Sequence, residues 1–285
     1  MLCEDMKPPR RKLVIVLSLA FAGVIALFVW KSIPPAEPIY HGKLLHVWLE
    51  EWRANAYPTT NWSTRSDQAK QEAADAVRVI GTDALPFLLE SLHTKESPLK
   101  WRLGKAVPVR WHRVLHLNYG PYDSQLPGID GFYLLGALGA PALPELRNLA
   151  EDGDLNHLRW GIGALGSLGS AGEPAIPFLI QCLTNTDWQT RQMAAWSLCA
   201  IKKQPDLAIP ALIQYLKFLK TLSLTAEDVY CVDYLSVWGT NAKPAVPLIL
   251  ELLESTNADK RLAATNSLPR IDPEAAERAH LLRQK

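Results

Sequence analysis

A five-residue motif occurs five times along this chain and constrains its fold more than any other feature. Each copy reads Ala, an aliphatic residue, Pro, a variable residue and a final Leu or Ile, and the copies occupy residues 84–88, 142–146, 175–179, 208–212 and 245–249. Pro144, Pro177, Pro210 and Pro247 are 33, 33 and 37 residues apart. A period of this length is typical of stacked helical hairpins rather than of a globular core. We therefore predict a helical repeat protein.

A second pattern upstream of each proline supports the repeat. One column of apolar residues contains Val77, Leu135, Leu165, Leu198, Leu235 and Leu268. Four residues before each of them lies a small or thiol side chain, at Ala73, Gly131, Gly161, Ala194, Cys231 and Ala264. Residues four apart share one face of a helix, so each helix can bury the large side chain and let a neighbour approach closely at the small one.

A glycine follows the apolar column by four residues in four of the repeats, at Gly81, Gly139, Gly169 and Gly239. Glycine tolerates the left-handed backbone that commonly ends a helix. The repeated proline then falls near the start of a second helix, where its missing N–H costs little. Each unit is therefore predicted to consist of a first helix, a glycine turn and a second helix.

The stretches Arg191–Leu198 and Arg261–Leu268, each with a basic residue three positions before the small one, resemble the HEAT-repeat family in its short bacterial form, the PBS-lyase-type HEAT-like repeats. Lys70 is equivalent in the first repeat, and the resemblance covers roughly residues 66 to 282. It implies an all-α fold, an α-solenoid of HEAT-like helical hairpins. Asp228 and Gly128 at the basic position, and Lys202 at the turn glycine, depart from the pattern.

Residues 13–30 contain no charge and would span about 27 Å as a helix, close to the thickness of the hydrocarbon core. We predict a single transmembrane helix. Arg10, Arg11 and Lys12 precede it, which places the N-terminus in the cytoplasm and the repeats outside a bacterial cytoplasmic membrane. In the alternative interpretation the segment is a signal peptide cleaved after residues 20–22, Ala-Phe-Ala, leaving a secreted or periplasmic protein.

The predicted organisation follows the chain in order. The segments are a cytoplasmic basic N-terminus at 1–12, the transmembrane helix at 13–30, a Pro-rich spacer at 31–42, a capping helix and loop at 43–65, and the repeat domain at 66–285, with a basic insertion at about 95–127. Leu45, Trp48, Leu49 and Trp52 lie on one face of the capping helix, where they can cover the open end of a repeat stack.

The sequence contains none of the common catalytic or metal-binding patterns. His112 and His116 are four residues apart, but Arg113 stands where a zinc hydrolase has its glutamate. The glycines at 161–169 fall at packing and turn positions of the repeat, and no GxSxG motif is present. The cysteines lack a CxxC spacing and are expected to be free buried thiols. We therefore predict no catalytic residue, no metal, no cofactor and no enzymatic activity.

The basic insertion is the part of the chain least like a repeat, and it supplies the predicted binding residues: Lys100, Trp101, Arg102, Arg110, Trp111 and Arg113. Its expected partner is an acidic protein surface, with anionic lipid as the second choice. A net charge of +1 gives no reason to expect nucleic acid.

We predict a membrane-anchored scaffold or adaptor that binds a protein or peptide along the concave surface formed by its second helices. Two alternatives come from the resemblance. Some PBS-lyase-type proteins attach bilins, which would make this chain a lyase-like enzyme or an accessory factor. Some HEAT-like proteins bind nucleic acid.

Overall fold

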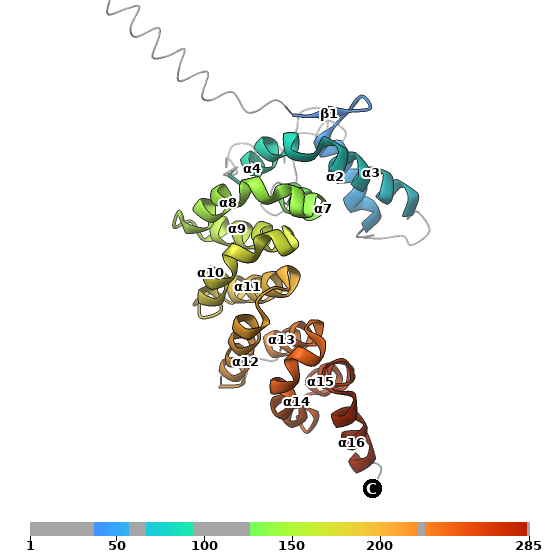
Figure 1. The fold of residues 1–285 in the computed structure, drawn as a ribbon, viewed down its shortest axis with the longest axis vertical. Helices are drawn as coiled ribbons and strands as arrows, with labels where there is room; N and C mark the ends of the chain where they lie inside the picture. Colours follow the sequence, from blue (N-terminus) through green and yellow to red (C-terminus); the bar gives the residue numbers. More distant parts are fainter. Residues whose placement is uncertain (1–36, 57–66, 94–125, 222–225, 284–285) are drawn as a thin grey trace, which may run out of the picture. The chain divides into compact units, whose positions relative to one another are not determined.

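The computed structural model describes residues 37–56, 67–93, 126–221 and 226–283 (Figure 1). Contacts divide the chain into two units, Met1–Ala36 and Glu37–Lys285, and every described residue belongs to the second. The predicted transmembrane segment at 13–30 therefore lies outside the described residues. Within the described ranges, no helix combines the length and the apolar character needed to cross a membrane.

The described part is almost entirely helical, as the repeat pattern predicted. Its first α-helices are α2 (Leu45–Ala56), α3 (Asp67–Ile80), α4 (Leu85–His93), α7 (Leu126–Leu135), α8 (Leu143–Glu151), α9 (Leu155–Ser167) and α10 (Ile176–Cys182). They are followed by α11 (Trp188–Ile201), α12 (Pro205–Thr221), α13 (Ala226–Val237), α14 (Val246–Leu253), α15 (Ala258–Ile271) and α16 (Pro273–Arg283). Short 3₁₀ turns join the two helices of several hairpins: η2 (Gly81–Ala84), η3 (Gly136–Ala142), η4 (Gly169–Ala175) and η5 (Gly239–Ala245).

Successive hairpins pack through their first helices. Helix α9 lies against α7 and α11, α11 lies against α13, and α13 lies against α15 (Figure 1). The second helices α8, α10 and α14 each contact the first helix of the following repeat. Buried apolar side chains form one continuous core through the described repeats. This arrangement is an all-α stack of helical hairpins, in which each unit covers the apolar side of its neighbour.

One register prediction is wrong. The left-handed glycine of the second repeat is Gly136, with φ of +52°, and not Gly139. The apolar column residue of this repeat is therefore Phe132, four residues before Gly136, in place of Leu135. Gly139 instead lies where a side chain would meet the next repeat, because a Cβ there would be 2.6 Å from Cδ2 of Leu168.

The turn prediction is confirmed at Gly81, Gly169 and Gly239, which all have φ between +56° and +60°. Lys202, which replaces the turn glycine, adopts the same left-handed conformation with φ of +50°. The repeated proline begins the second helix in α8, α10 and α14. In α12 the helix starts earlier, at Pro205, so Pro210 lies inside it.

A two-stranded hairpin that the sequence analysis did not predict precedes α2. Strands β1 (Ile39–Tyr40) and β2 (Lys43–Leu44) pair antiparallel, with Ile39 opposite Leu44. His41 and Gly42 between them both have positive φ, the backbone of the tight turns that fit the twist of a hairpin. The hairpin spans the last four residues of the predicted spacer, 39–42, and the first two of the predicted capping segment, 43–44, and leads directly into α2.

Asp187 links two neighbouring repeats, through α9 and α11. Its side chain caps the N-terminus of α11 by accepting a hydrogen bond from the backbone N–H of Thr190 at 2.8 Å. Arg159 of α9 donates two hydrogen bonds to the same carboxylate, at 2.9 and 2.7 Å. The Arg159 hydrogen bond, aided by those from Thr190, lowers the pKa of Asp187 to about 2.

Replacing Asp187 by Ala should destabilise the protein by about 2 kcal/mol, because both the cap and the link to Arg159 are lost.

Asp187→Asn keeps a good capping residue and removes only the charge. Since the folded-state pKa lies below the ordinary value, the carboxylate stabilises the fold above about pH 4, and this contribution disappears as the pH falls toward about 2. Urea melts from neutral to acid pH should show a smaller acid-induced loss for Asp187→Asn than for wild type. Parallel curves would contradict this role.

Candidate protein-binding surface

The six residues predicted to contact a partner, Lys100, Trp101, Arg102, Arg110, Trp111 and Arg113, lie outside the described residues. So do His112 and His116. The structure therefore gives these side chains no geometry, and their role stays a prediction.

The recurring arginines of the repeat pattern have structural partners. Arg191 is almost fully buried and donates hydrogen bonds to the backbone carbonyls of Asn185 and Thr186, both at 3.0 Å. Arg261 makes the equivalent bonds to Ser255 and Thr256, at 2.7 and 2.9 Å. In both repeats the guanidinium satisfies carbonyls just beyond the end of the preceding second helix, where intrahelical donors are lacking. These two arginines therefore stabilise the stack, and their guanidinium groups are engaged by the backbone of the same repeat pair.

The described cysteines are free and buried, as predicted. Burial raises the pKa of Cys182 to about 11 and that of Cys199 to about 12, and Cys231 is also buried. Such thiols are protonated at neutral pH and are poor nucleophiles. Cys3 lies outside the described residues.

Most of the described tryptophans are in the core. Trp48, Trp52, Trp160 and Trp238 are buried and Trp196 is half-buried. Trp188, at the first position of α11, is half exposed and does not follow this pattern. Most of the described tryptophans therefore pack against neighbouring helices.

Sequence reasoning missed a histidine pair near the start of α9. Nδ1 of His157 lies 2.5 Å from a carboxylate oxygen of Asp152, and the ring of His93 meets that of His157 edge-on at 5.6 Å. Hydrogen bonds from the Asp154 N–H and from His157 lower the pKa of Asp152. Across the described ranges, no group of three His, Cys, Asp or Glu side chains could hold a metal ion. The pair is best understood as a link among α4, α8 and α9.

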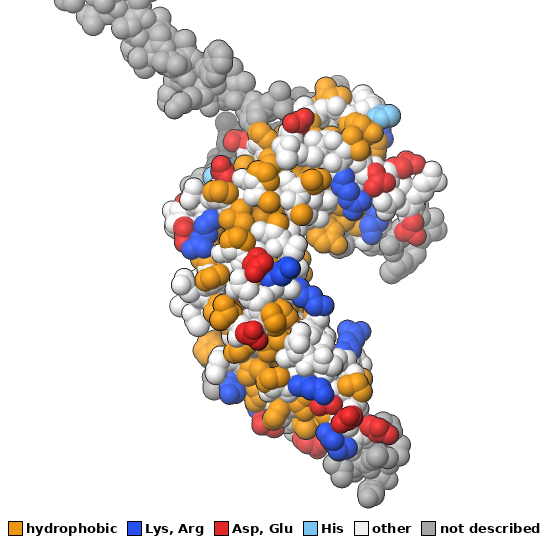
Figure 2. Space-filling view, in the orientation of Figure 1, with side chains coloured by type: hydrophobic (Ala, Val, Ile, Leu, Met, Phe, Trp, Pro, Cys, Tyr) orange, Lys and Arg blue, Asp and Glu red, His pale blue; other side chains and the backbone are white. Residues whose placement is uncertain are grey.

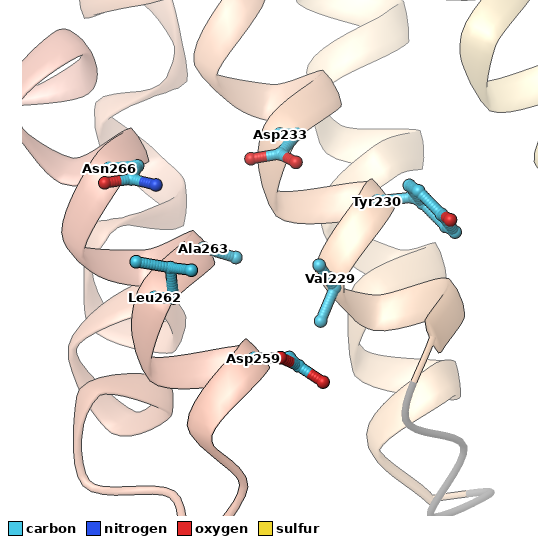
Figure 3. Close-up of a pocket in the computed structure, with 7 residues that line it drawn as sticks. All are labelled: Val229, Tyr230, Asp233, Asp259, Leu262, Ala263 and Asn266. Atoms are coloured by element: carbon cyan, nitrogen blue, oxygen red, sulfur yellow. The ribbon is translucent and has the colours of Figure 1, made fainter. Parts of the chain in front are cut away.

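A pocket of about 330 Å³ opens between α13 and α15, the first helices of two consecutive repeats (Figure 3). Helix α13 contributes Val229, Tyr230 and Asp233, and α15 contributes Asp259, Leu262, Ala263 and Asn266. Tyr230 and Leu262 are 45% and 59% exposed, so both side chains are accessible to a partner. The pocket is large enough for a few side chains of a partner.

The pocket combines this apolar lining with negative charge. Asp233 and Asp259 belong to different helices, and no lysine or arginine is among the described residues that line it. In Figure 3 the Asp233 carboxylate lies between the two helices, above Val229 and Ala263. Oδ1 of Asp233 accepts a hydrogen bond from the hydroxyl of Ser267 at 3.2 Å, which orients the carboxylate. A cationic group next to an apolar one would complement this lining.

Elsewhere the visible surface carries no single dominant charge. Figure 2 shows apolar side chains along this face of the repeats, with acidic and basic side chains of the described residues interspersed among them. A nucleic-acid interface would need a broad basic patch. The α13–α15 pocket is thus the most distinctive candidate surface in the described part. It lies on first helices, whereas sequence reasoning had placed the binding surface on second helices.

The comparison with protein-family models agrees with the helical repeats. Residues 133–199, from the end of α7 through most of α11, match the family model described as HEAT repeats. This match supports a HEAT-repeat relationship for that part of the chain. No curated protein matches the sequence significantly. Among solved structures, the chain is similar to the crystal structure of an engineered protein, with 20% identity, coverage of 81% of this chain and 97% of that chain, and a TM-score of 0.40.

Proposed function

We propose that this chain is a membrane-anchored scaffold that binds another protein through the surface of its repeats and carries out no turnover. The observation that carries the proposal is the open α13–α15 pocket, where large apolar side chains remain exposed on packed helices. Stacked hairpins hold such a surface rigid, so little ordering cost is incurred on binding. The HEAT-repeat match supports the same class of function, since proteins of this kind commonly bind proteins.

Partner binding is tested by in-cell crosslinking followed by purification of the full chain from native membranes. A protein that copurifies in near-equal amounts with the full chain, and not with an unrelated single-span protein, is the expected result. Recovery of the same background proteins with both baits would contradict a scaffold function.

The basic insertion is proposed as a second contact region. Charge reversal at Arg110 and Arg113, by Arg→Glu at both positions, should reduce the yield of the captured partner. Unchanged recovery would remove the insertion from the recognition surface and leave the repeats as the remaining candidate.

The membrane placement of the repeats is part of the proposal, and it rests on the uncharged segment 13–30 behind Arg10, Arg11 and Lys12. An alkaline phosphatase fused to the C-terminus should be active, because that enzyme folds only outside the cytoplasm. An inactive fusion of normal abundance would place the repeats inside the cell.

A further inference from the structure

The described first helices carry an acidic residue at one equivalent position in three repeats. Counted six residues before the left-handed glycines Gly81, Gly136 and Gly239, the acids are Asp75, Asp130 and Asp233. This equivalence appears only once the register of the second repeat is corrected to Gly136. The three carboxylates have different hydrogen-bond partners: Asp75 and Asp130 each pair with an arginine, and Asp233 accepts a hydrogen bond from a serine.

Asp75 is neutralised within its own helix. Nη1 of Arg78, three residues further along α3, donates a hydrogen bond to Oδ1 of Asp75 at 3.0 Å, and Gln71 donates another. Both partners are on the exposed face of α3. Asp75 therefore needs nothing from a second element.

Asp130 is neutralised by a helix from outside the repeats. Helix α2 packs against both α3 and α7, and Nε of Arg53 donates a hydrogen bond to Oδ2 of Asp130 at 2.8 Å. Next to that ion pair, the buried ring of Trp52 lies 5.9 Å from the ring of Tyr133 on α7. Burial raises the pKa of Asp130, and the charge of Arg53 opposes the rise. Helix α2 thus packs on the repeats by placing an arginine against an acidic residue and a tryptophan against a neighbouring tyrosine.

Asp233 occupies the equivalent position but is exposed, and within the described residues no helix covers it as α2 covers Asp130. Within the described residues it accepts the Ser267 hydrogen bond and has no basic partner, and a second carboxylate, Asp259, faces the same pocket. Val229, Leu262 and Ala263 offer an apolar floor beside the two acids. A bound helix resembling α2 would supply a cation for the two acids and an apolar side chain to cover the apolar floor.

We propose that the α13–α15 pocket binds a helical segment of a partner protein that places an arginine against Asp233 and an adjacent aromatic or aliphatic side chain over Val229, Leu262 and Ala263. Helix α2 packs against α3 and α7, and Asp130 lies on α7, the later of these two helices. The pocket lies between α13 and α15, and Asp233 lies on α13, the earlier one. The comparison with α2 therefore indicates which side chains would bind and not how the bound helix would be oriented. This inference rests on the proposed scaffold function and names the class of segment that is bound.

The test uses the purified full chain in detergent and a fluorescent peptide with the sequence of residues 43–56, which contains Trp52 and Arg53. A matched peptide carries Arg53→Glu. Fluorescence polarisation should show saturable binding of the arginine peptide in the micromolar range, at least about tenfold tighter than the glutamate peptide. In the Asp233→Lys protein the preference should reverse, because the two charges are exchanged.

Two variants serve as controls. Asp75→Lys changes the equivalent acid where the partners lie on the same helix, and it should leave both peptides' affinities unchanged. Leu262→Ser alters an exposed side chain, so folding is preserved, and it should weaken the arginine peptide by about threefold to tenfold. An arginine preference that persists in Asp233→Lys, or an absence of saturable binding, would overturn the proposal. So would a wild-type dimer that the peptide disperses, since the occupant would then be a second copy.

Failure here is distinguishable from failure of the scaffold function. If a partner is captured equally by wild type and Asp233→Lys from native membranes, the scaffold stands and the pocket assignment falls. If the peptides behave as expected but no partner is captured, the pocket stands as a binding site and the cellular scaffold function falls.

Discussion

Gly166→Ala should destabilise the repeat domain by about 2–3 kcal/mol, although alanine is normally the better helix former. Gly166 lies in α9, and an added Cβ would be 2.4 Å from Oγ and 2.7 Å from Cα of Ser197 in α11. The second contact involves backbone, so the two helices would have to move apart. That movement would also stretch the hydrogen bond from Ser197 Oγ to the carbonyl of Ile162, now 2.9 Å long and buried.

Gly163 provides the matched control in the same helix. A Cβ there would have its nearest contact at 3.4 Å, with the flexible side chain of Met193. Gly163→Ala should therefore be neutral or stabilise the protein by up to about 1 kcal/mol. Denaturant unfolding of both variants measures the difference. Equal effects of the two substitutions would contradict the close contact between α9 and α11.

Phe132→Ala should cost about 3–5 kcal/mol, the range observed when a fully buried aromatic side chain is removed. Phe132 is completely buried on α7 and occupies the apolar column of the second repeat. Its ring also lies beside Gly139, where an added Cβ would be 3.3 Å from Cδ1 of Phe132. Truncation therefore leaves a cavity at the contact between the second and third repeats.

The control is Leu138→Ala in the adjoining turn η3, where the side chain is 47% exposed. Its loss should change the stability by less than about 0.5 kcal/mol. Thermal or urea unfolding compares the two variants. A cost below about 1 kcal/mol for Phe132→Ala would show that the second repeat is not packed in the corrected register.

The repeat architecture could be predicted from sequence because its signals are local. A proline at the start of a helix and a glycine at its end act within one turn, so Pro144, Pro177 and Pro247 mark real helix starts. The second repeat was misaligned because residues 126–145 satisfy the same spacing twice, through Gly128, Phe132 and Gly136 and again three residues later. Spacing to the proline does not decide between them: Gly136 shares the eight residues of Gly169 to Pro177 and of Gly239 to Pro247, whereas Gly139 shares the five residues of Gly81 to Pro86.

The candidate surface could not be predicted in the same way. Asp233 and Leu262 are 29 residues apart, and only the packing of α13 on α15 brings them to one pocket. The sequence analysis assigned no role to Asp233, because the surroundings of this acid depend on how distant helices pack. Arg53 covers Asp130 from a helix that precedes the repeats, and no local pattern links those two residues. The basic insertion was predicted to bind a partner because of its amino-acid composition, and composition does not show how side chains are arranged in space.

The central claim is that a partner protein occupies the α13–α15 pocket, and site-specific photocrosslinking in living cells tests it most directly. A photoreactive phenylalanine is placed at Tyr230 in the pocket of the full-length chain, and at Phe218 on α12 as a control position, since both side chains are similarly exposed. We predict a single crosslinked adduct from position 230 that is absent from position 218 and is lost when Asp233→Lys is added. No adduct at position 230, or one that persists in Asp233→Lys, would contradict the account.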